Sequence, residues 1–577
     1  MQSIAILPFK NISKKTEYSY LCSAIPIEIT HLLTNQEKLK IISVNRTSSF
    51  SEVPDYYEKL NADLLMEGTL LASDNQVRIT IQIISGKDST CLFSSKFDEP
   101  TTNLFKLLDN ISAKIIRYLN LELIENNIKI DSNAYNYYLK GIHHWNLWDE
   151  NNIEKAISLF EKSIKIEPEF ALAYARLSNC WSLLAGIQKG NILKNYSTAK
   201  TAALKAMKLN SSLLEAHLSL ALIKLINDVD ISGAFYSFQM AFTINNHSSE
   251  THYYYSFYLL VIGEYKKALK YLKYALNRNP FNIQMNSTYG FALLLASDYV
   301  GAKKQLKKTL SFAPDSDASY DALFWVYMET KEFALAEKLI TDNASRVIHS
   351  PAAQVALYHR MGLKEKKNKW IKKVVSNLNK DTYKNHYREA SIAYLNIDAI
   401  EKGMNYLELF YKERIGFIMV LTHPAWKTFR ESRKFYKYKK RLNLLRPPVL
   451  SDEFPQVVRE MMVIASSTKE ELSINIFDLL YIEAQNIYSK VVWKKDGEVK
   501  ETFLRVALSK IIDQTINHQL YRCHNSFIIN TNIPYQIKGN RKSMKLTLKE
   551  HTFEIPVSRN KTSNIHKYLK TDIAFSK

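Results

Sequence analysis

The pattern of apolar and polar positions over residues 1–125 predicts a mixed α/β domain. Short apolar runs are typical of strands at residues 4–9, 39–44 and 63–71. Residues 77–83 alternate between apolar and polar side chains, as a half-buried antiparallel strand does, and residues 91–97 are expected to return as its hairpin partner. Helical spacing predicts two helices, at residues 25–33, with Pro26 in the first turn, and at residues 104–119.

A repeat of 34 residues occupies the middle of the chain, over residues 131–445. Alanines recur at this spacing, each three residues after a large apolar side chain, at positions 234, 268, 302 and 336. Ala156 and Ala199 extend the series towards the N-terminus, and prolines follow Ala156, Ala268 and Ala302 by twelve residues. Such a period is typical of tetratricopeptide repeats, in which paired helices cross closely at a small side chain and proline follows the second helix. We therefore predict an all-α tetratricopeptide solenoid, with a weaker helical pattern over 347–379 and a degenerate repeat over 395–411.

The pattern changes again after residue 446. Residues 446–473 are expected to form a linker, and residues 474–577 a mainly-β domain. Apolar runs and alternation predict strands at residues 476–481, 487–493, 499–504, 527–529, 543–548 and 552–557. Residues 482–486 are expected to turn out of the first strand, Asp496 and Gly497 to form a hairpin turn, and residues 506–515 to form one amphipathic helix.

Net charge narrows the class of partner. Lysine and arginine outnumber acidic residues by 78 to 57 in 577 residues, a net charge of +21, which favours an anionic partner, with a merely lysine-coated surface as the alternative. Residues 474–577 hold 17 basic and nine acidic side chains, which suits a surface facing phosphates. Residues 427–446 hold nine basic side chains and one acid. They are expected to be the solvated face of a capping helix, with a DNA or interdomain contact as the alternative.

Other classes of function find little support in the sequence. The four cysteines are scattered without a CxxC pair, so we expect neither a disulfide framework nor a zinc site. His143 and His144 are adjacent on a predicted helix and point to different faces, which disfavours a metal site. Phosphate-loop, dinucleotide and catalytic-triad motifs are missing, so we expect no enzyme activity and no cofactor. With no signal peptide and no long apolar run, a cytoplasmic protein without membrane contact is expected.

Three stretches near the C-terminus share a resemblance to one family. Residues 480–486 (LYIEAQN), 520–530 (LYRCHNSFIIN) and 554–559 (EIPVSR) resemble, in this order and spacing, a LytTR-type DNA-binding domain. The resemblance implies that loops at strand ends insert side chains into successive major grooves. Carried over onto the matching positions, it implies DNA contacts from Gln485, Asn486, Ser489, Lys490, Arg522, His524, Asn525 and Arg559.

The chemistry of these residue types agrees with that assignment. Asparagine and glutamine pair with adenine and arginine with guanine, whereas lysine and serine suit phosphate. The family often has arginine where Asn525 stands, which leaves the base preferred there open. Alternatively, His524 caps a turn, and Arg559 pairs with Glu554 or Glu550.

The N-terminal region also resembles a known domain. Residues 4–12 (IAILPFKNI), 43–50 (SVNRTSSF) and 66–70 (MEGTL) resemble the TolB-like domain, which implies no catalytic residues. Together the parts predict a bacterial transcription regulator that binds double-stranded DNA, with a homodimer expected on repeated half-sites. Its N-terminal and repeat domains would sense a signal or bind a protein or peptide. The alternative is a tetratricopeptide adaptor without specific DNA binding.

Overall fold

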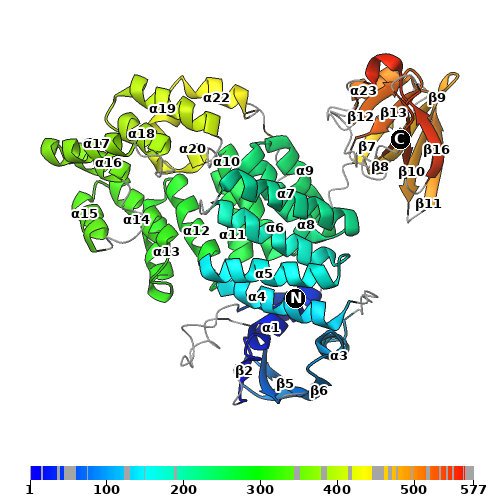
Figure 1. The fold of residues 1–577 in the computed structure, drawn as a ribbon, viewed down its shortest axis with the longest axis horizontal. Coiled ribbons are helices and arrows are strands. Elements are labelled where there is room, and N and C mark those ends of the chain that lie inside the picture. Colours follow the sequence, from blue (N-terminus) through cyan, green and yellow to red (C-terminus); the bar gives the residue numbers. More distant parts are fainter. Residues whose placement is uncertain are drawn as a thin grey trace. The chain divides into compact units, whose positions relative to one another are not determined.

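The protein folds into two compact units, Met1–Pro455 (unit 1) and Gln456–Lys577 (unit 2) (Figure 1). Within the ranges that the structure describes, no helix has both the length and the apolarity that a bilayer crossing requires. The computed structural model describes residues 2–565 except 14–16, 35–38, 45–59, 61, 74–75, 122–129, 148–149, 187–190, 343–350, 379–385, 414–418, 443, 445–446, 448–460, 466–470, 476–478, 496–497, 515–519, 532–534, 541–542, 549–550 and 563–564.

Unit 1 begins with a mixed sheet. Its strands are β1 (Gln2–Ile6), β2 (Lys10–Asn11), β3 (Leu39–Ser43), β4 (Leu64–Ala72), β5 (Gln76–Ser85) and β6 (Cys91–Pro100). β1 pairs in parallel with β3 and β4, while β4, β5 and β6 are antiparallel neighbours, so the predicted hairpin is confirmed. Helices α1 (Leu21–Thr34) and α3 (Leu104–Tyr118) share one hydrophobic core with this sheet, in which Ile4, Ile79 and Ile111 are fully buried.

Helix α1 begins four residues before its predicted start. Pro26 therefore lies inside the helix and not in its first turn, contrary to the prediction. A proline inside a helix leaves the carbonyl four residues earlier without its usual donor. That carbonyl belongs to Cys22, and it accepts a hydrogen bond from the backbone N–H of Phe9 at 2.9 Å. The link between β1 and β2 thus satisfies the group that the proline leaves open.

Antiparallel helix pairs follow, and the tetratricopeptide solenoid is confirmed. The pairs are α4 (Ser132–Leu147) and α5 (Glu150–Ile166), α6 (Ala171–Gly186) and α7 (Ile192–Leu209), α8 (Leu214–Ile223) and α9 (Ile231–Ile244), α10 (Ser249–Ile262) and α11 (Tyr265–Leu276), α12 (Ile283–Leu295) and α13 (Tyr299–Phe312), α14 (Asp317–Glu329) and α15 (Phe333–Asp342), α16 (Pro351–Arg360) and α17 (Lys364–Leu378), and α18 (His386–Leu395) and α19 (Ile400–Glu413). The alanines of the repeat lie on second helices and are 0% exposed, as close helix crossing requires: Ala156, Ala199, Ala234, Ala268, Ala302 and Ala336.

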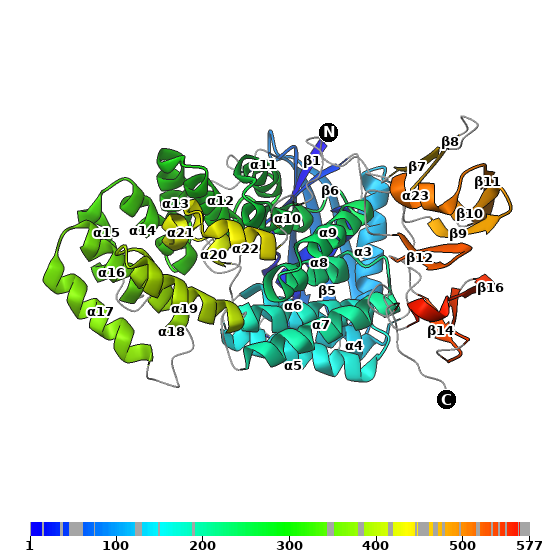
Figure 2. The ribbon, with the colours of Figure 1, turned by 90° about the horizontal axis from the view of Figure 1, so that it is seen from above.

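After α19 the chain turns back across the array as a return segment, residues 419–444. It contains α20 (Met419–Thr422), the 3-10 turn η3 (Pro424–Trp426), α21 (Lys427–Glu431) and α22 (Phe435–Arg441). Both ribbon views show α20 beside α10 (Figures 1 and 2). His423 Nε2 lies 2.9 Å from Asp321 Oδ2, and the indole N–H of Trp426 donates to Ser391 Oγ at 3.2 Å. These contacts hold the return segment on the first helices of the later repeats.

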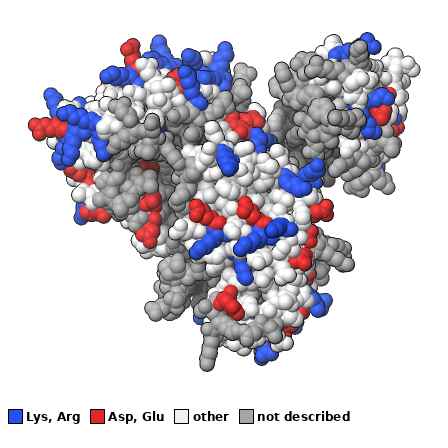
Figure 3. All heavy atoms as spheres, viewed as in Figure 1, with Lys and Arg blue, Asp and Glu red and all other residues white. Residues whose placement is uncertain are grey.

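The basic stretch at 427–446 is only partly a solvated face. Lysine and arginine side chains gather over α17 and α22 on the face shown in Figure 3. Lys437 and Lys440 of α22 are exposed. Lys427 lies 2.5 Å from Glu329, and Arg441 lies 2.8 Å from Glu408, so two of the nine basic side chains bind the array.

Unit 2 is built on an antiparallel sheet in the order β11-β10-β9-β13-β12. Its strands are β9 (Leu479–Gln485), β10 (Tyr488–Lys495), β11 (Glu498–Leu504), β12 (Leu520–His524) and β13 (Phe527–Asn530). One face packs on the strands β14 (Gln536–Lys538), β15 (Lys545–Leu548) and β16 (His551–Pro556). The other face packs on helix α23 (Leu508–Gln514) and the hairpin of β7 (Met461–Ala465) and β8 (Glu471–Asn475). Adjacent side chains are therefore both buried, Tyr481 against the first layer and Ile482 against the second.

The mainly-β prediction for unit 2 is confirmed, with differences in detail. β9 continues to Gln485, although residues 482–486 were expected to turn out of the strand. β7 and the first residues of β8 fall in the predicted linker, because Ile464 is an apolar residue that packs into the core beside α23. β12 and β14 are strands that the polar sequence did not predict. The predicted turn at Asp496 and Gly497 lies outside the described residues, as does most of the 43–50 stretch.

A backbone hydrogen bond and an apolar contact join the N-terminal sheet to the helical array within unit 1. The backbone N–H of Ser43 in β3 donates to the carbonyl of Arg278 at 2.7 Å. Phe281, from the same loop after α11, packs against the small core that contains Ala5 and Ile42. The sheet is thus held at its β3 edge by the fourth helix pair.

A buried ionic cluster joins α1 to α6 and α8. Glu215 Oε1 lies 3.3 Å from His31 Nδ1 and 3.5 Å from Arg176 Nη2. Arg176 is 3% exposed and Glu215 is 7% exposed. Burial alone would raise the pKa of Glu215, but the hydrogen bond with His31 and the charge of Arg176 together lower that pKa to about 2. The ionised carboxylate therefore compensates for the buried guanidinium.

Glu215→Gln should lower the free energy of unfolding of unit 1 by about 3–5 kcal/mol at neutral pH, because the buried Arg176 loses its ion pair and keeps only the charges of Glu250 and Glu28. The folded pKa of Glu215 lies below its unfolded value. Its contribution is therefore complete above about pH 4.5 and is lost as pH falls towards 2. The difference between wild type and variant in urea unfolding, followed by helical circular dichroism, should shrink over that range.

Glu154→Gln is the matched control, since Glu154 is exposed on α5. We expect this control to change the free energy of unfolding by less than about 0.5 kcal/mol. Equal stability of Glu215→Gln and wild type at neutral pH would contradict the role given to the cluster.

Candidate nucleic-acid interface

Three loops of unit 2 meet at one end of its sheet. β9 and β13 are antiparallel neighbours, so the turn that leaves β9 lies beside the turn that enters β13. The backbone N–H of Ala484 donates to the carbonyl of Ser526 at 2.8 Å and joins these two turns. The backbone N–H of Ser558, after β16, donates to the carbonyl of Cys523 at 2.9 Å and brings the third loop onto the second. The three stretches that resemble the LytTR family are thereby brought together.

The β9–β10 turn presents two amides to solvent. Gln485 and Asn486 are both exposed. Asn486 has a φ of 56°, a left-handed conformation that asparagine tolerates better than most residues and that suits a tight hairpin turn. The side-chain amide of Gln485 donates to Glu483 Oε2 at 3.2 Å. Both amides are therefore accessible from solvent.

The structure corrects the assignment of Ser489. Its side chain is 1% exposed, and its hydroxyl donates to the carbonyl of Val506 at 2.7 Å. Because Ser489 points into the core that contains α23, it holds β10 to the chain before that helix. The neighbouring Lys490 points to the other face, where its amine lies 2.6 Å from Glu501 Oε1 and its side chain is 17% exposed.

The β12–β13 turn is shaped by two of the predicted residues. Arg522 Nη2 donates to the carbonyl of Asn525 at 2.7 Å, and its Nε is buried without a hydrogen bond to any described residue. His524 Nδ1 accepts a hydrogen bond from the backbone N–H of Ser526 at 3.2 Å, so His524 does cap the turn. Asn525 is exposed at the tip.

Arg559 begins the 3-10 turn η4 (Arg559–Lys561) and is exposed. The alternative pairing with Glu554 is not seen, since that carboxylate lies 2.7 Å from Lys545 and 3.6 Å from Lys538. Glu550 lies outside the described residues. Within the described part of unit 2, no acid forms an ion pair with Arg559, which leaves its guanidinium available to a ligand.

An open hollow of about 570 Å³ lies between the β9–β10 and β12–β13 turns and the start of α23. Asn486, Arg522 and Asn525 line it on one side, and the exposed Arg505 and Lys510 line it on the other. Sequence reasoning missed the last two. Their only signal was two basic residues around the start of a predicted helix, and nothing in the sequence placed that helix beside the β9–β10 turn.

Lys561 is a further basic residue that the sequence did not indicate. Its amine donates to the carbonyl of Arg522 and lies 5.7 Å from the centre of the Tyr521 ring. It thus ties η4 to β12.

Comparisons with known families agree with this geometry. Residues 469–570 match the family described as the LytTr DNA-binding domain. The C-terminal unit carries a LytTR DNA-binding domain. Residues 1–114 match a different family, described as the second domain of HilA/YgeH-like transcriptional regulators. The predicted TolB-like character of this region stays a prediction.

Several proteins are similar to parts of the chain. The transcriptional regulator HilA of Salmonella typhimurium (strain LT2) is 22% identical over 285 residues, which are 48% of this chain and 51% of HilA. Putative adenylate cyclase 3 of Rhizobium meliloti (strain 1021) is 25% identical over 239 residues, which are 38% of this chain and 40% of that protein. The chain thus spans about half the length, or less, of these relatives.

Among solved structures, similarity extends to a LytTr DNA-binding domain of a putative methyl-accepting/DNA response regulator from Bacillus cereus. The two sequences are 21% identical, the match covers 19% of this chain and 97% of that one, and the TM-score is 0.16.

Ser489→Ala should lower the stability of the LytTR domain by about 1–3 kcal/mol, because the buried carbonyl of Val506 loses its donor. Affinity for DNA should stay unchanged once the fraction of folded protein is taken into account. Thermal unfolding and DNA titration of the full chain check the two expectations. Ser509→Ala, at an exposed position of α23, is the control for stability. Unchanged stability together with a loss of DNA affinity would show that Ser489 contacts DNA.

Proposed function

We propose that this chain is a transcription regulator that binds promoter DNA sequence-specifically through its LytTR domain. The observation that carries the proposal is the meeting of three strand-end turns at one end of the sheet, two of which line an open hollow. Groups that pair with bases and groups that bind phosphates stand side by side there. The similarity of residues 1–114 to a domain of transcriptional regulators supports the same conclusion.

The exposed side chains divide into two roles. Gln485, Asn486, Asn525 and Arg559 carry the donors and acceptors that read base edges in the major groove. Arg505 and Lys510 flank the hollow and suit the phosphates on either side, which would set the register of the domain on the duplex.

The remaining predicted residues support these contacts. In our proposal Arg522 and His524 hold the β12–β13 turn in the shape that presents Asn525. Arg522 also lines the hollow and adds positive charge there. Lys490 would reach a phosphate only by exchanging its ion pair with Glu501.

The proposal gives unit 1 the task of receiving a signal or binding a protein or peptide. Helical repeats present extended surfaces that suit such partners. The chain matches about half of HilA and 40% of putative adenylate cyclase 3. The activity of neither whole protein is therefore carried over to this chain. A second copy of the chain on a repeated half-site is part of the same proposal.

Selection of bound sequences from a random duplex library by the full-length chain tests the proposal. A specific regulator should enrich one motif and keep binding it in the presence of heparin. Heparin competes for the electrostatic attraction to phosphates, whereas base contacts add affinity that heparin cannot provide. If no motif is enriched and heparin competes as well as any duplex, the chain is a tetratricopeptide adaptor instead.

Arg559→Ala should weaken binding to the selected site by about 1–3 kcal/mol and relax the preference at one base pair, since an arginine that pairs with guanine is lost. Binding to random DNA should change much less. Lys500→Ala is the matched control, because Lys500 is exposed where β11 pairs with Trp493, away from the three turns. Equal losses on specific and random DNA would make Arg559 a phosphate contact only.

Lys510→Ala should weaken specific and random binding together and reduce the slope of log affinity against log salt by ~1, as expected for one phosphate contact. The same titration with Lys490→Ala tests whether Lys490 leaves its ion pair with Glu501 when the domain binds DNA. An equal drop in slope places Lys490 at the phosphates, and an unchanged slope removes it from the interface.

A further inference from the structure

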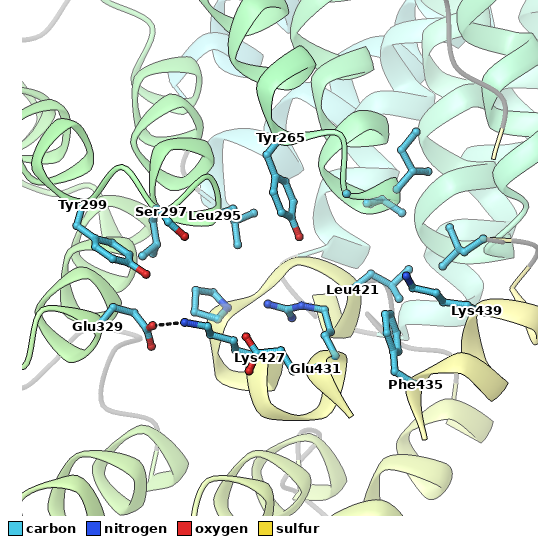
Figure 4. A pocket seen from close by; sticks show the side chains of 17 residues that line it. Tyr265, Leu295, Ser297, Tyr299, Glu329, Leu421, Lys427, Glu431, Phe435 and Lys439 are labelled. Atoms are coloured by element: carbon cyan, nitrogen blue, oxygen red, sulfur yellow. Dashed lines mark hydrogen bonds and ion pairs between the residues drawn. The ribbon is translucent and has the colours of Figure 1, made fainter. Parts of the chain in front are cut away.

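A cavity of about 340 Å³ lies in unit 1 where the return segment crosses the array (Figure 4). One wall comes from the turns between α10 and α11 and between α12 and α13, together with the end of α14. The opposite wall comes from the return segment. Its volume is at the small end of the range for ligand pockets, which suits a molecule of few heavy atoms.

The array side of the cavity is built from equivalent positions of two repeats. Tyr265 and Tyr299 are 34 residues apart and begin α11 and α13, three residues before the buried alanine of each helix. Figure 4 shows both tyrosine hydroxyls directed towards the return segment. Leu295 adds apolar surface between them. The two hydroxyl donors thus come from equivalent positions of the solenoid, with the apolar side chain of Leu295 between them.

The return segment contributes three positive charges to the cavity, from Lys427, Arg430 and Lys439, and one negative charge, from Glu431. Lys427 is matched by Glu329, at 2.5 Å, and Glu329 also lies 3.3 Å from Arg360. Burial opposes the ionisation of Glu329, but its contacts with Lys427 and Arg360 outweigh burial and lower its pKa. This carboxylate is therefore already bound by two cations.

Arg430 lacks such a match. Its Nη1 donates to the carbonyls of Val420 at 3.0 Å and His423 at 2.7 Å, which positions the guanidinium at the cavity. Among the described residues, none forms an ion pair with Arg430, and none accepts a hydrogen bond from its Nε or Nη2. The side chain is only partly exposed, and burial lowers its pKa. An arginine nevertheless stays charged at neutral pH.

We propose that this cavity binds a small organic anion, whose carboxylate meets Arg430 and whose apolar part lies among Leu295, Leu421 and Phe435. A carboxylate matches the remaining donors of a guanidinium fork, and such charge-assisted bonds are roughly twice as strong as those between neutral groups. Lys439 and the two tyrosine hydroxyls supply further donors at the rim. The apolar side chains provide the burial that holds an uncharged tail.

Such a ligand would join the turns of two repeats to the return segment. Since residue 444 precedes unit 2 by about a dozen residues, a bound anion would favour the docked form of the segment that leads into the LytTR domain. Binding itself does not rest on the proposed DNA function, whereas an effect of the ligand on DNA binding does.

Titration of the full-length chain with octanoate, followed by calorimetry, tests the proposal without DNA. We expect saturable binding of one molecule per chain, at least about tenfold tighter than octan-1-ol, which has the same tail and no charge. Butyrate and phenylacetate, titrated in the same way, cover shorter and aromatic tails.

Variants assign the binding to this cavity. Arg430→Gln should weaken octanoate binding by about tenfold or more, and Lys439→Gln and Tyr299→Phe by about two- to tenfold each. Because Arg430 also holds two backbone carbonyls, its variant is compared by thermal unfolding, and the other two decide the outcome if it unfolds. Lys412→Gln is the matched control, since Lys412 is exposed on α19 and does not line the cavity.

Three results would overturn the proposal. The first is that none of the three carboxylates binds saturably up to about 10 mM. The second is that octan-1-ol binds as tightly as octanoate, which would indicate apolar partitioning. The third is that Lys439→Gln and Tyr299→Phe bind octanoate as tightly as the Lys412→Gln control. None of these results depends on whether the chain binds DNA.

Discussion

The burial of β9 on both faces is the constraint on which the C-terminal unit depends. Tyr481 packs towards one layer and Ile482 towards the other, so a shift of one residue would exchange the two cores. The register of β9 with β10 and β13 then brings the two turns together. The end of β16 joins them through the carbonyl of Cys523. Core packing, which contributes nothing to base recognition itself, therefore decides which polar side chains share one surface.

Unit 1 depends on a different constraint, the close crossing of paired helices. Buried alanines at a spacing of 34 residues let each second helix approach its partner, and the same period places tyrosines at equivalent turns. The N-terminal sheet is joined to this array by the buried charges around Glu215 and by the β3 edge. The return segment then covers part of the array and introduces cations from outside the repeat. Both candidate sites of the chain thus arise where a regular scaffold meets an irregular segment.

Sequence reasoning was most successful where one physical signal dominated. The 34-residue period, the alternation over β5 and the three resembling stretches each predicted what the structure contains. It failed where a side chain had two possible roles. Ser489 suits phosphate by its chemistry, yet its hydroxyl is used by the carbonyl of Val506. Pro26 suits a helix start, yet α1 tolerates it because Phe9 donates to the carbonyl left open. In each case the deciding partner is distant in sequence.

The sequence by itself determined the class of each part of the chain and the residue types of the proposed nucleic-acid interface, because periodicity and local motifs depend on neighbours along the chain. Only the tertiary structure decided which of those residues are exposed, that Arg505 and Lys510 lie beside them, and that Arg430 lies at a cavity without an ion pair to any described carboxylate. The physical reason is that exposure and charge pairing depend on packing between distant elements. A strand sequence alone does not reveal which layer covers each of its faces.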